Sequence, residues 1–145
     1  TAQLGTMKLT EEIDAIRTLG LSPAQVLVLP RVLALVLTLP LLVFVGDVAG
    51  VAGAMLMANA TLDITPHAFI DRLQVALSPR HYVIGIAKAP VFALVVAMIG
   101  CRQGMLVEGD VVSLGRRTTS AVVQAIFMVI ALDAMFAVLY YMLKI

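Results

Sequence analysis

Three long stretches of apolar sequence limit what this chain can fold into. They run over residues 32–60, 82–100 and 118–143, and each is interrupted only by a proline or by isolated polar side chains. A bilayer with a hydrocarbon core of about 30 Å is crossed by about 20 apolar residues in an α-helix. All three stretches come close to that length or exceed it. We therefore expect an all-α fold, a polytopic transmembrane helical bundle with three membrane-spanning helices in this chain.

The composition favours a membrane protein over a soluble helical one. Hydrophobic residues make up 61% of the 145 residues and charged residues 13%, and the mean hydropathy is +1.04. Soluble domains average about 45–50% apolar and about 25% charged residues. Too little polar sequence remains to cover three buried helices in water. The net charge is +1, and no large cluster of Lys or Arg occurs, so we expect no nucleic-acid partner.

Hydroxyl-proline pairs mark expected helix starts between the apolar stretches. They are Ser22-Pro23, Thr65-Pro66 and Ser78-Pro79. Each pair combines an N-cap side chain with a proline at the first helical position, where the missing N–H is tolerated. The segment 65–77 gathers apolar side chains near one face, which is typical of a helix lying along a membrane surface.

The expected layout is one partial domain over residues 1–145. Its parts are a region 1–22 with a polar helix, a first span 23–60, an outer loop 61–80 with the interfacial helix, a second span 81–101, a cytosolic loop 102–117 and a last span 118–145.

The basic residues predict the orientation of these spans. Lys8, Arg17, Arg31, Arg102, Arg116 and Arg117 fall on one side, and Arg72, Arg80 and Lys144 fall on the other. Cytosolic loops carry the excess of Lys and Arg. Residues 1–31 and 101–117 are therefore predicted to face the cytosol.

A short polar helix is predicted directly before the first apolar stretch. Thr10 is its expected N-cap, and Glu11, Glu12 and Asp14 place negative charge at the positive end of the helix dipole. Gly20 is its expected left-handed stop. On these grounds alone, an ordinary surface helix is the simpler interpretation.

Several longer motifs resemble one family of membrane proteins. They are "AQLGTMKLTEEIDAIRTLGLSPAQVLVLPRVLALVLTLPLL", "GIAKAPVFALVVAMIGCRQG" and "GDVVSLGRRTTSAVVQAIFMVIALDAMFAVLY". Together they resemble the C-terminal part of the MlaE-type permeases, the membrane subunits of ABC transporters that move phospholipids with an MCE-domain partner. The chain has Leu114-Gly115-Arg116-Arg117 where the family commonly has Val-Gly and a small residue before Thr-Thr, which leaves the subfamily open.

The resemblance implies a role for the polar helix. In that family the corresponding helix docks into the cytosolic ATPase, so Glu11, Glu12, Asp14 and Arg17 become the expected coupling residues. The chain lacks a Gly-x-x-x-x-Gly-Lys-Ser/Thr loop. The resemblance therefore implies a transport subunit that is not itself an enzyme and has no cofactor or metal of its own.

The resemblance also implies partners and a location. ATP and Mg²⁺ belong to a separate ABC ATPase subunit. An MCE-domain protein, phospholipid, a second permease copy in a homodimer and a STAS-type small subunit complete the expected partners. The expected location is the bacterial inner membrane, with multiple passes.

Three charged residues interrupt the expected spans. Asp47, Lys88 and Asp133 lie at similar depth in the outer half of the membrane when helical rise is counted from the span ends. Charge at membrane depth is costly and is normally paired or faces a cavity. We predict a cluster in which one or both carboxylates neutralise Lys88. Locking the helices together is the simpler role, and contact with a lipid headgroup is the alternative.

Two further patterns favour packing within the membrane. Gly46, Gly50 and Gly53 form a stripe of small residues that allows close helix approach, within the subunit or across a homodimer. Met128, Met135 and Met142 recur every seven residues, and methionine adapts to irregular apolar shapes. Ordinary packing is the simpler interpretation for the methionines, and a lipid-facing surface is the alternative.

Two other functions remain open on the sequence. A proton-coupled secondary carrier would also keep carboxylates and a lysine in the membrane. A structural assembly subunit would show no transport defect when cavity-facing residues are changed but assembly is intact. Dependence on an ATPase partner distinguishes the transporter from the carrier.

Overall fold

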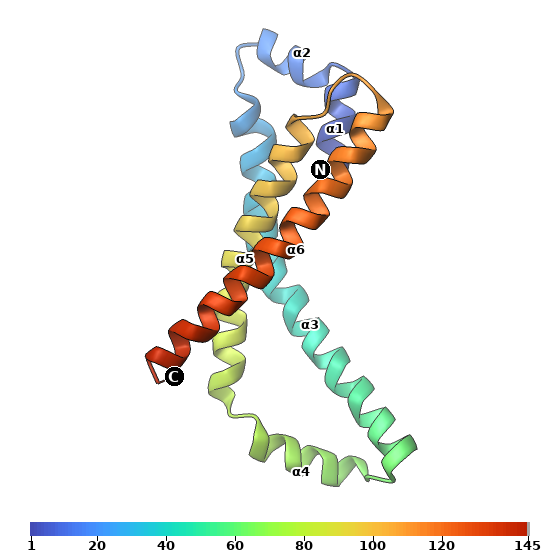
Figure 1. Cartoon of the computed structure of the whole chain (residues 1–145), viewed down its shortest axis with the longest axis vertical. Helices are drawn as coiled ribbons and strands as arrows, with labels where there is room; N and C mark the ends of the chain where they lie inside the picture. The colour runs from blue at the N-terminus through green and yellow to red at the C-terminus, as the bar shows by residue number, and fades with distance from the viewer. Residues whose placement is uncertain (145) are drawn as a thin grey trace. The chain divides into compact units, whose positions relative to one another are not determined.

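The computed structural model describes residues 1–144. Within these residues all the regular secondary structure is helical (Figure 1). The elements are α1 (Ala2–Leu9), α2 (Glu12–Thr18), the π-helical segment η1 (Ala24–Val28), α3 (Leu29–Leu62), α4 (Pro66–Ala76), α5 (Pro79–Met105) and α6 (Val111–Met142). The predicted all-α fold is confirmed.

Three helical stretches are long and apolar enough to cross a membrane. They are Ala24–Leu62, Pro79–Met105 and Val111–Met142. The expected number of spans is therefore confirmed, and the helices run beyond the expected span ends. The sixth helix begins early because the Asp110 side chain accepts a hydrogen bond from the Ser113 N–H at 2.6 Å. This cap places Arg116 and Arg117 on the first turns of α6 rather than in a loop.

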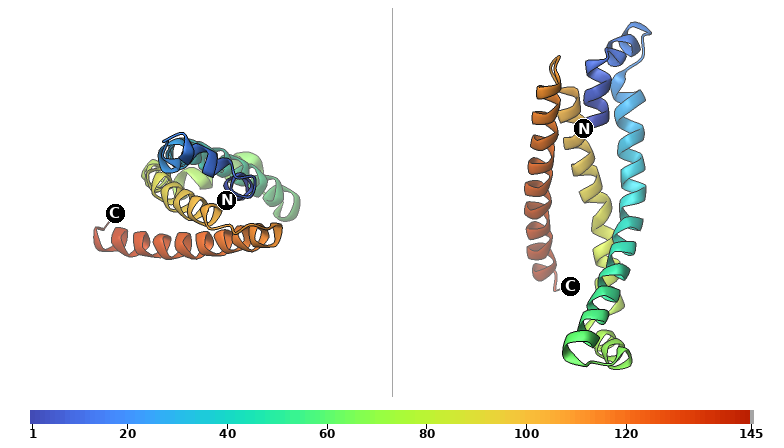
Figure 2. Two further views of the ribbon diagram at one scale, coloured as in Figure 1. Left: turned by 90° about the horizontal axis from the view of Figure 1, so that it is seen from above. Right: turned by 90° about the vertical axis from the view of Figure 1, so that its right-hand side faces the viewer.

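The chain divides into two compact units, residues 1–35 with 91–145 and residues 36–90. In the first unit α1 packs against α2 and against the start of α6 (Figure 2). The core of this unit has one buried side chain from each of four elements, and these are Leu4, Ile13, Leu27 and Cys101. The polar N-terminal helices are thus built into the same core as the ends of the spans.

Two glycines allow α1 to approach its neighbours closely. A Cβ at Gly104 on α5 would lie 2.7 Å from the Leu4 Cβ and 2.9 Å from the Thr1 carbonyl oxygen. A Cβ at Gly5 on α1 would collide with the Leu114 side chain on α6. Real Cβ atoms essentially never make contacts this short. At Gly104 the backbone of α1 would have to move to make room, whereas at Gly5 the neighbouring side chains would have to move.

The second unit contains most of α3, the whole of α4 and the first part of α5. Helix α4 begins as predicted, with Pro66 at N1 and the Thr65 hydroxyl accepting a hydrogen bond from the Ala68 N–H at 3.4 Å. The Ser78 hydroxyl caps α5 in the same way by accepting from the Arg80 N–H at 3.2 Å.

The expected cap at Ser22 forms differently. The Ser22 carbonyl, rather than its hydroxyl, accepts the N–H of Val26 at 3.1 Å, and η1 has no side-chain cap. The helix there opens as a π-helical turn, whose backbone bonds reach further along the chain than those of an α-helix.

Candidate functional site

Helix α2 is shorter than the polar helix expected from sequence. Glu11 is its N-cap, with a left-handed φ of 61°, and the predicted cap at Thr10 is wrong. The Thr10 hydroxyl is instead engaged at the end of α1, 3.1 Å from the Thr6 carbonyl, and it also lies 3.1 Å from a Glu12 carboxylate oxygen. A hydroxyl that closes one helix in this way does not cap the next.

The predicted stop at Gly20 is confirmed. Gly20 has a φ of +77°, which glycine adopts at little cost. Its N–H bonds to the Arg17 carbonyl at 3.0 Å, and the Leu21 N–H bonds to the Ile16 carbonyl at 3.2 Å. This pair of bonds is a Schellman motif, which satisfies the last carbonyls of a helix.

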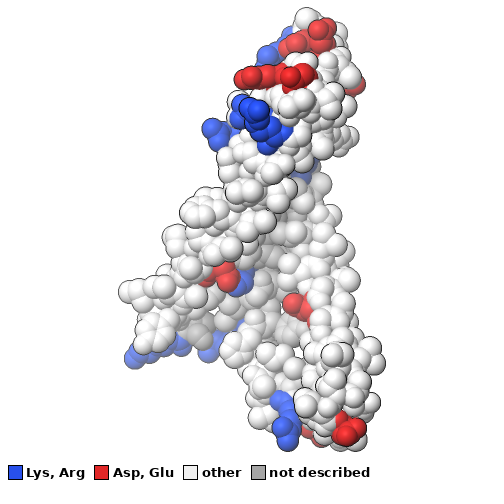
Figure 3. Space-filling view, turned by 45° about the vertical axis from the view of Figure 1, so that its right-hand side comes forward, with Lys and Arg blue, Asp and Glu red and all other residues white. Residues whose placement is uncertain are grey.

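The two faces of α2 differ sharply. Ile13 is 2% exposed within the core of the first unit, and Ile16 packs against the same core. Glu12, Asp14 and Arg17 are exposed, and charged side chains gather at this end of the unit (Figure 3). Arg17 approaches Asp14 at 3.8 Å with both side chains more than half exposed, so this pair contributes little stability. The charges therefore remain available to a partner.

Hydrogen bonds join α1 to the end of α5. The Thr1 hydroxyl donates to the Gly100 carbonyl at 2.9 Å, and the Lys8 ammonium donates to the Met105 carbonyl. Because α1 also packs on α2, a displacement of α2 has a direct mechanical path to the second expected span.

A polar contact that the structure shows between α5 and α6 was not predicted from the sequence. The Gln103 amide donates to the Gln124 side chain at 3.0 Å, and the Gln124 amide donates to the Ser120 hydroxyl at 3.3 Å. Gln103 is 2% exposed, and among residues 1–144 its Oε1 atom has no hydrogen-bond partner. Glutamines on two apolar segments were the available signal, but their mutual register could not be read from either segment alone.

The three predicted intramembrane charges lie in different surroundings. Asp47 belongs to the second unit and lines a pocket of about 240 Å³ together with residues from the start of α5. Lys88 is in the second unit and Asp133 in the first, and both make interactions. Among residues 1–144 the Asp47 side chain forms no ion pair, with Lys88 or with any other base. The pairing of Lys88 with Asp133 stays a prediction.

The glycine stripe lies on an open face of α3. Among residues 1–144, a Cβ at Gly46, Gly50 or Gly53 would meet no atom within 4 Å. Close packing of this stripe stays a prediction and requires a surface beyond the described part of the chain.

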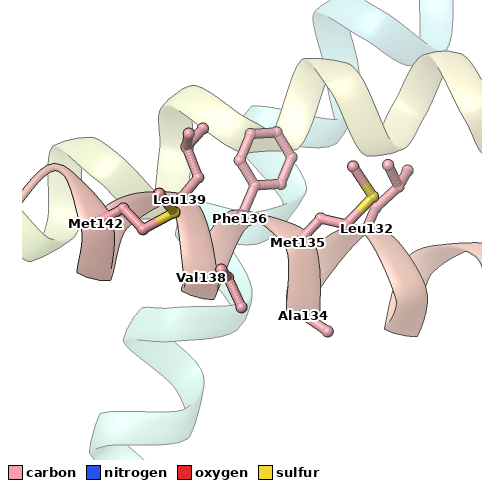
Figure 4. Close-up of a pocket in the computed structure, with 7 residues that line it drawn as sticks. All are labelled: Leu132, Ala134, Met135, Phe136, Val138, Leu139 and Met142. Carbon is pink, nitrogen blue, oxygen red and sulfur yellow. The ribbon is translucent and has the colours of Figure 1, made fainter.

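The methionines of α6 line two separate hollows. Met128 lies in a groove between α5 and α6. Met135 and Met142 line a wholly different apolar hollow on α6 (Figure 4). There Met135 and Phe136 project on one side of the helix, while Ala134 and Val138 project on the other (Figure 4). Ordinary packing therefore stays the prediction for these methionines, with a lipid-facing surface as the alternative.

These features define a class of protein, a multi-pass helical membrane protein whose spans share a core with an exposed polar helix. Residues 1–139 match the family described as Permease MlaE. The chain belongs to the MlaE permease family.

Named relatives agree with the family match. A "Probable ABC transporter permease protein" of Rickettsia felis is 34% identical over 97% of this chain and 54% of its own length. The "Probable ABC transporter permease protein ycf63" of Pyropia yezoensis is 33% identical over 99% of this chain and 54% of its own. The "Protein TRIGALACTOSYLDIACYLGLYCEROL 1, chloroplastic" of Arabidopsis thaliana is 35% identical over 86% of this chain and 36% of its own length. The chain spans about half the length of the first two relatives.

Proposed function

We propose that this chain forms part of the permease subunit of an ABC-type transporter that moves phospholipid. Lipid passes between the bacterial inner membrane and an MCE-domain partner, and a separate cytosolic ATPase supplies the energy from ATP and Mg²⁺. Family membership and the names of the relatives support the transporter class. The name of the Arabidopsis relative includes the name of a lipid, a galactosylated diacylglycerol. This name supports a lipid as the cargo.

The division of α2 into a buried and a charged face carries the proposal. Ile13 anchors the helix in a core that also contains side chains of α1, η1 and α5. Glu11, Glu12, Asp14 and Arg17 are exposed beside it. A partner that grips these charges moves the base of the spans with them, because close-packed cores transmit displacement rather than absorbing it. This is the arrangement a coupling helix needs.

The proposal includes further partners, which the resemblance to the family suggests. The permease acts as a homodimer, with the cavity for lipid between the two copies, and a STAS-type small subunit binds on the cytosolic side. The open stripe of Gly46, Gly50 and Gly53 supplies one surface suited to close helix contact.

Charge reversal on α2 tests the coupling role. The variant Glu12→Lys/Asp14→Lys in the full-length permease is expected to lose ATPase co-purification and ATP-driven lipid transport, since two attractive contacts become repulsive. Asp71→Lys on α4 is the control, because Asp71 is also more than half exposed. Normal ATPase assembly and transport in the double variant would contradict the coupling role.

The lipid-transport assay also tests the two alternative functions, a proton-coupled carrier and a structural assembly subunit. A proton-coupled carrier would keep transporting without the ATPase and would stop when the proton gradient is collapsed. A structural assembly subunit would tolerate changes at Lys88 and Asp133 with transport intact, provided the complex still assembles.

A further inference from the structure

The pocket beside Asp47 has the composition of a cation site. It lies within the second unit, between α3 and the start of α5, and measures about 240 Å³. Its lining is Asp47, Val51, Leu77, His81, Tyr82 and Gly85. These residues include one carboxylate, one phenol ring and one imidazole, and no Lys or Arg. A pocket of this kind attracts a positive group and repels a phosphate.

The Asp47 carboxylate has no partner of its own in the described part of the chain. It lies in the middle of the apolar helix α3, and residues 1–144 supply its side chain with neither an ion pair nor a hydrogen bond. Carboxylates in membrane-spanning segments are costly unless they are paired or face a cavity, and such residues mark sites of function. The structure provides the cavity but not the counter-ion.

The pocket lies near the end of α5 that is predicted to face outward. His81 and Tyr82 belong to the first turn of this helix, which begins at Pro79. Tyrosine is enriched where a helix meets the headgroup layer. Gly85 lines the pocket one turn further along α5, and Lys88 lies three residues beyond Gly85. A lipid bound near this end of the helix would present its headgroup, rather than its acyl chains, to the pocket.

A second hollow adjoins the first. It is apolar, measures about 500 Å³, and shares Leu77 and Tyr82 with the pocket beside Asp47. Sites for drug-sized ligands run from about 300 to 1,000 Å³. The smaller pocket has room for a small charged group, and the larger hollow has room for the apolar part of the same molecule. A charged end joined to an apolar body is the chemistry of a lipid.

We propose that this pocket binds the ammonium group of an aminophospholipid headgroup. The Asp47 carboxylate is the counter-ion, the Tyr82 ring contacts the cation through its face, and a His81 ring nitrogen can accept a hydrogen bond from a primary ammonium. The inference rests on the proposed function in one respect, that the permease meets phospholipid at this end of its helices. It adds a headgroup preference and the residues that set it.

Lipid binding to the full-length permease tests the site. Native mass spectrometry of the detergent-purified protein would compare phosphatidylethanolamine with phosphatidylglycerol carrying the same acyl chains. The expected preference for phosphatidylethanolamine is about tenfold, from one ion pair and one cation–π contact. Asp47→Asn is expected to abolish the preference, and Val51→Phe is expected to weaken phosphatidylethanolamine binding by filling the pocket while keeping the carboxylate.

Asp63→Asn is the matched control. Asp63 is another carboxylate of the same unit, lies outside the pocket, and has a left-handed φ of 50° that asparagine adopts readily. This variant should keep the full preference. Equal binding of both lipids by the unchanged protein, or a preference that survives Asp47→Asn, would overturn the proposal. Loss of the preference on adding EDTA would also overturn it, because the site would then belong to a divalent cation.

The binding measurement is independent of coupling. It uses neither ATP nor the ATPase, so its failure leaves the role of α2 standing. A failed charge reversal on α2 likewise leaves the ammonium site standing.

Discussion

The two units of this chain differ in how much of their surface they bury by themselves. In the first unit, side chains from α1, α2, η1 and α5 share one core, and glycine positions bring backbones into close contact. In the second unit Ala89 is the one buried apolar residue among those described, and the glycine stripe of α3 is open. A close-packed core resists compression and transmits displacement, while open apolar faces depend on lipid or other protein to cover them. The first unit is therefore suited to transmit force, and the second to bind.

The largest effect is expected from removing the anchor of α2. Ile13→Ala should lower the free energy of unfolding by about 2–5 kcal/mol, because a fully packed side chain is replaced by a cavity. The measurement is the thermal unfolding of the purified permease, together with the ratio of lipid transported to ATP hydrolysed, which should fall. Ile70→Ala on α4 is the control, since Ile70 is 45% exposed. Similar losses in the two variants would remove the contrast between the units.

A medium effect is expected from filling the contact between α1 and α5. Gly104→Val should cost about 1–3 kcal/mol by overpacking, because the Thr1 backbone oxygen at 2.9 Å cannot move aside cheaply. Gly53→Val provides the comparison, since its Cβ would meet open space. Thermal unfolding checks the first variant. For the second, loss of the dimer with an intact fold would show that the open stripe packs against another copy.

The smallest effect is expected at the glutamine contact. Gln124→Leu should cost about 1–2 kcal/mol, because the Gln103 amide then loses its acceptor while remaining buried. The double variant Gln103→Leu/Gln124→Leu should recover most of this loss, since no buried polar group is left unpaired. The unfolding temperatures of the single and double variants test whether the second substitution restores stability. If the double variant unfolds at a lower temperature than the single variant, the glutamine contact does more than satisfy the hydrogen-bonding groups of the two side chains.

Local chemistry accounts for the parts of the fold that the sequence predicted. The three spans follow from apolar length, α4 from the Thr65-Pro66 pair, and the end of α2 from Gly20. Each of these signals lies within the segment whose structure it predicts. They are accordingly readable from a single segment.

Contacts between distant segments account for what was missed. Helix α1 depends on Gly104, far along the chain, for its close packing. Asp47 on α3 shares a pocket with His81, Tyr82 and Gly85 on α5, and counting along either helix alone does not predict this neighbourhood. Helix α3 has 34 residues, or roughly 51 Å of rise, which exceeds the hydrocarbon thickness, so its residue count does not translate into depth.

Left-handed residues bracket α2 on both sides, Glu11 at its start and Gly20 at its end. A right-handed helix cannot propagate through such a residue. The helix therefore can neither lengthen into α1 nor merge with η1 when a load is applied. If α2 is the coupling helix, its fixed length would let a partner's movement pass on as displacement of the whole helix rather than as rewinding of its backbone.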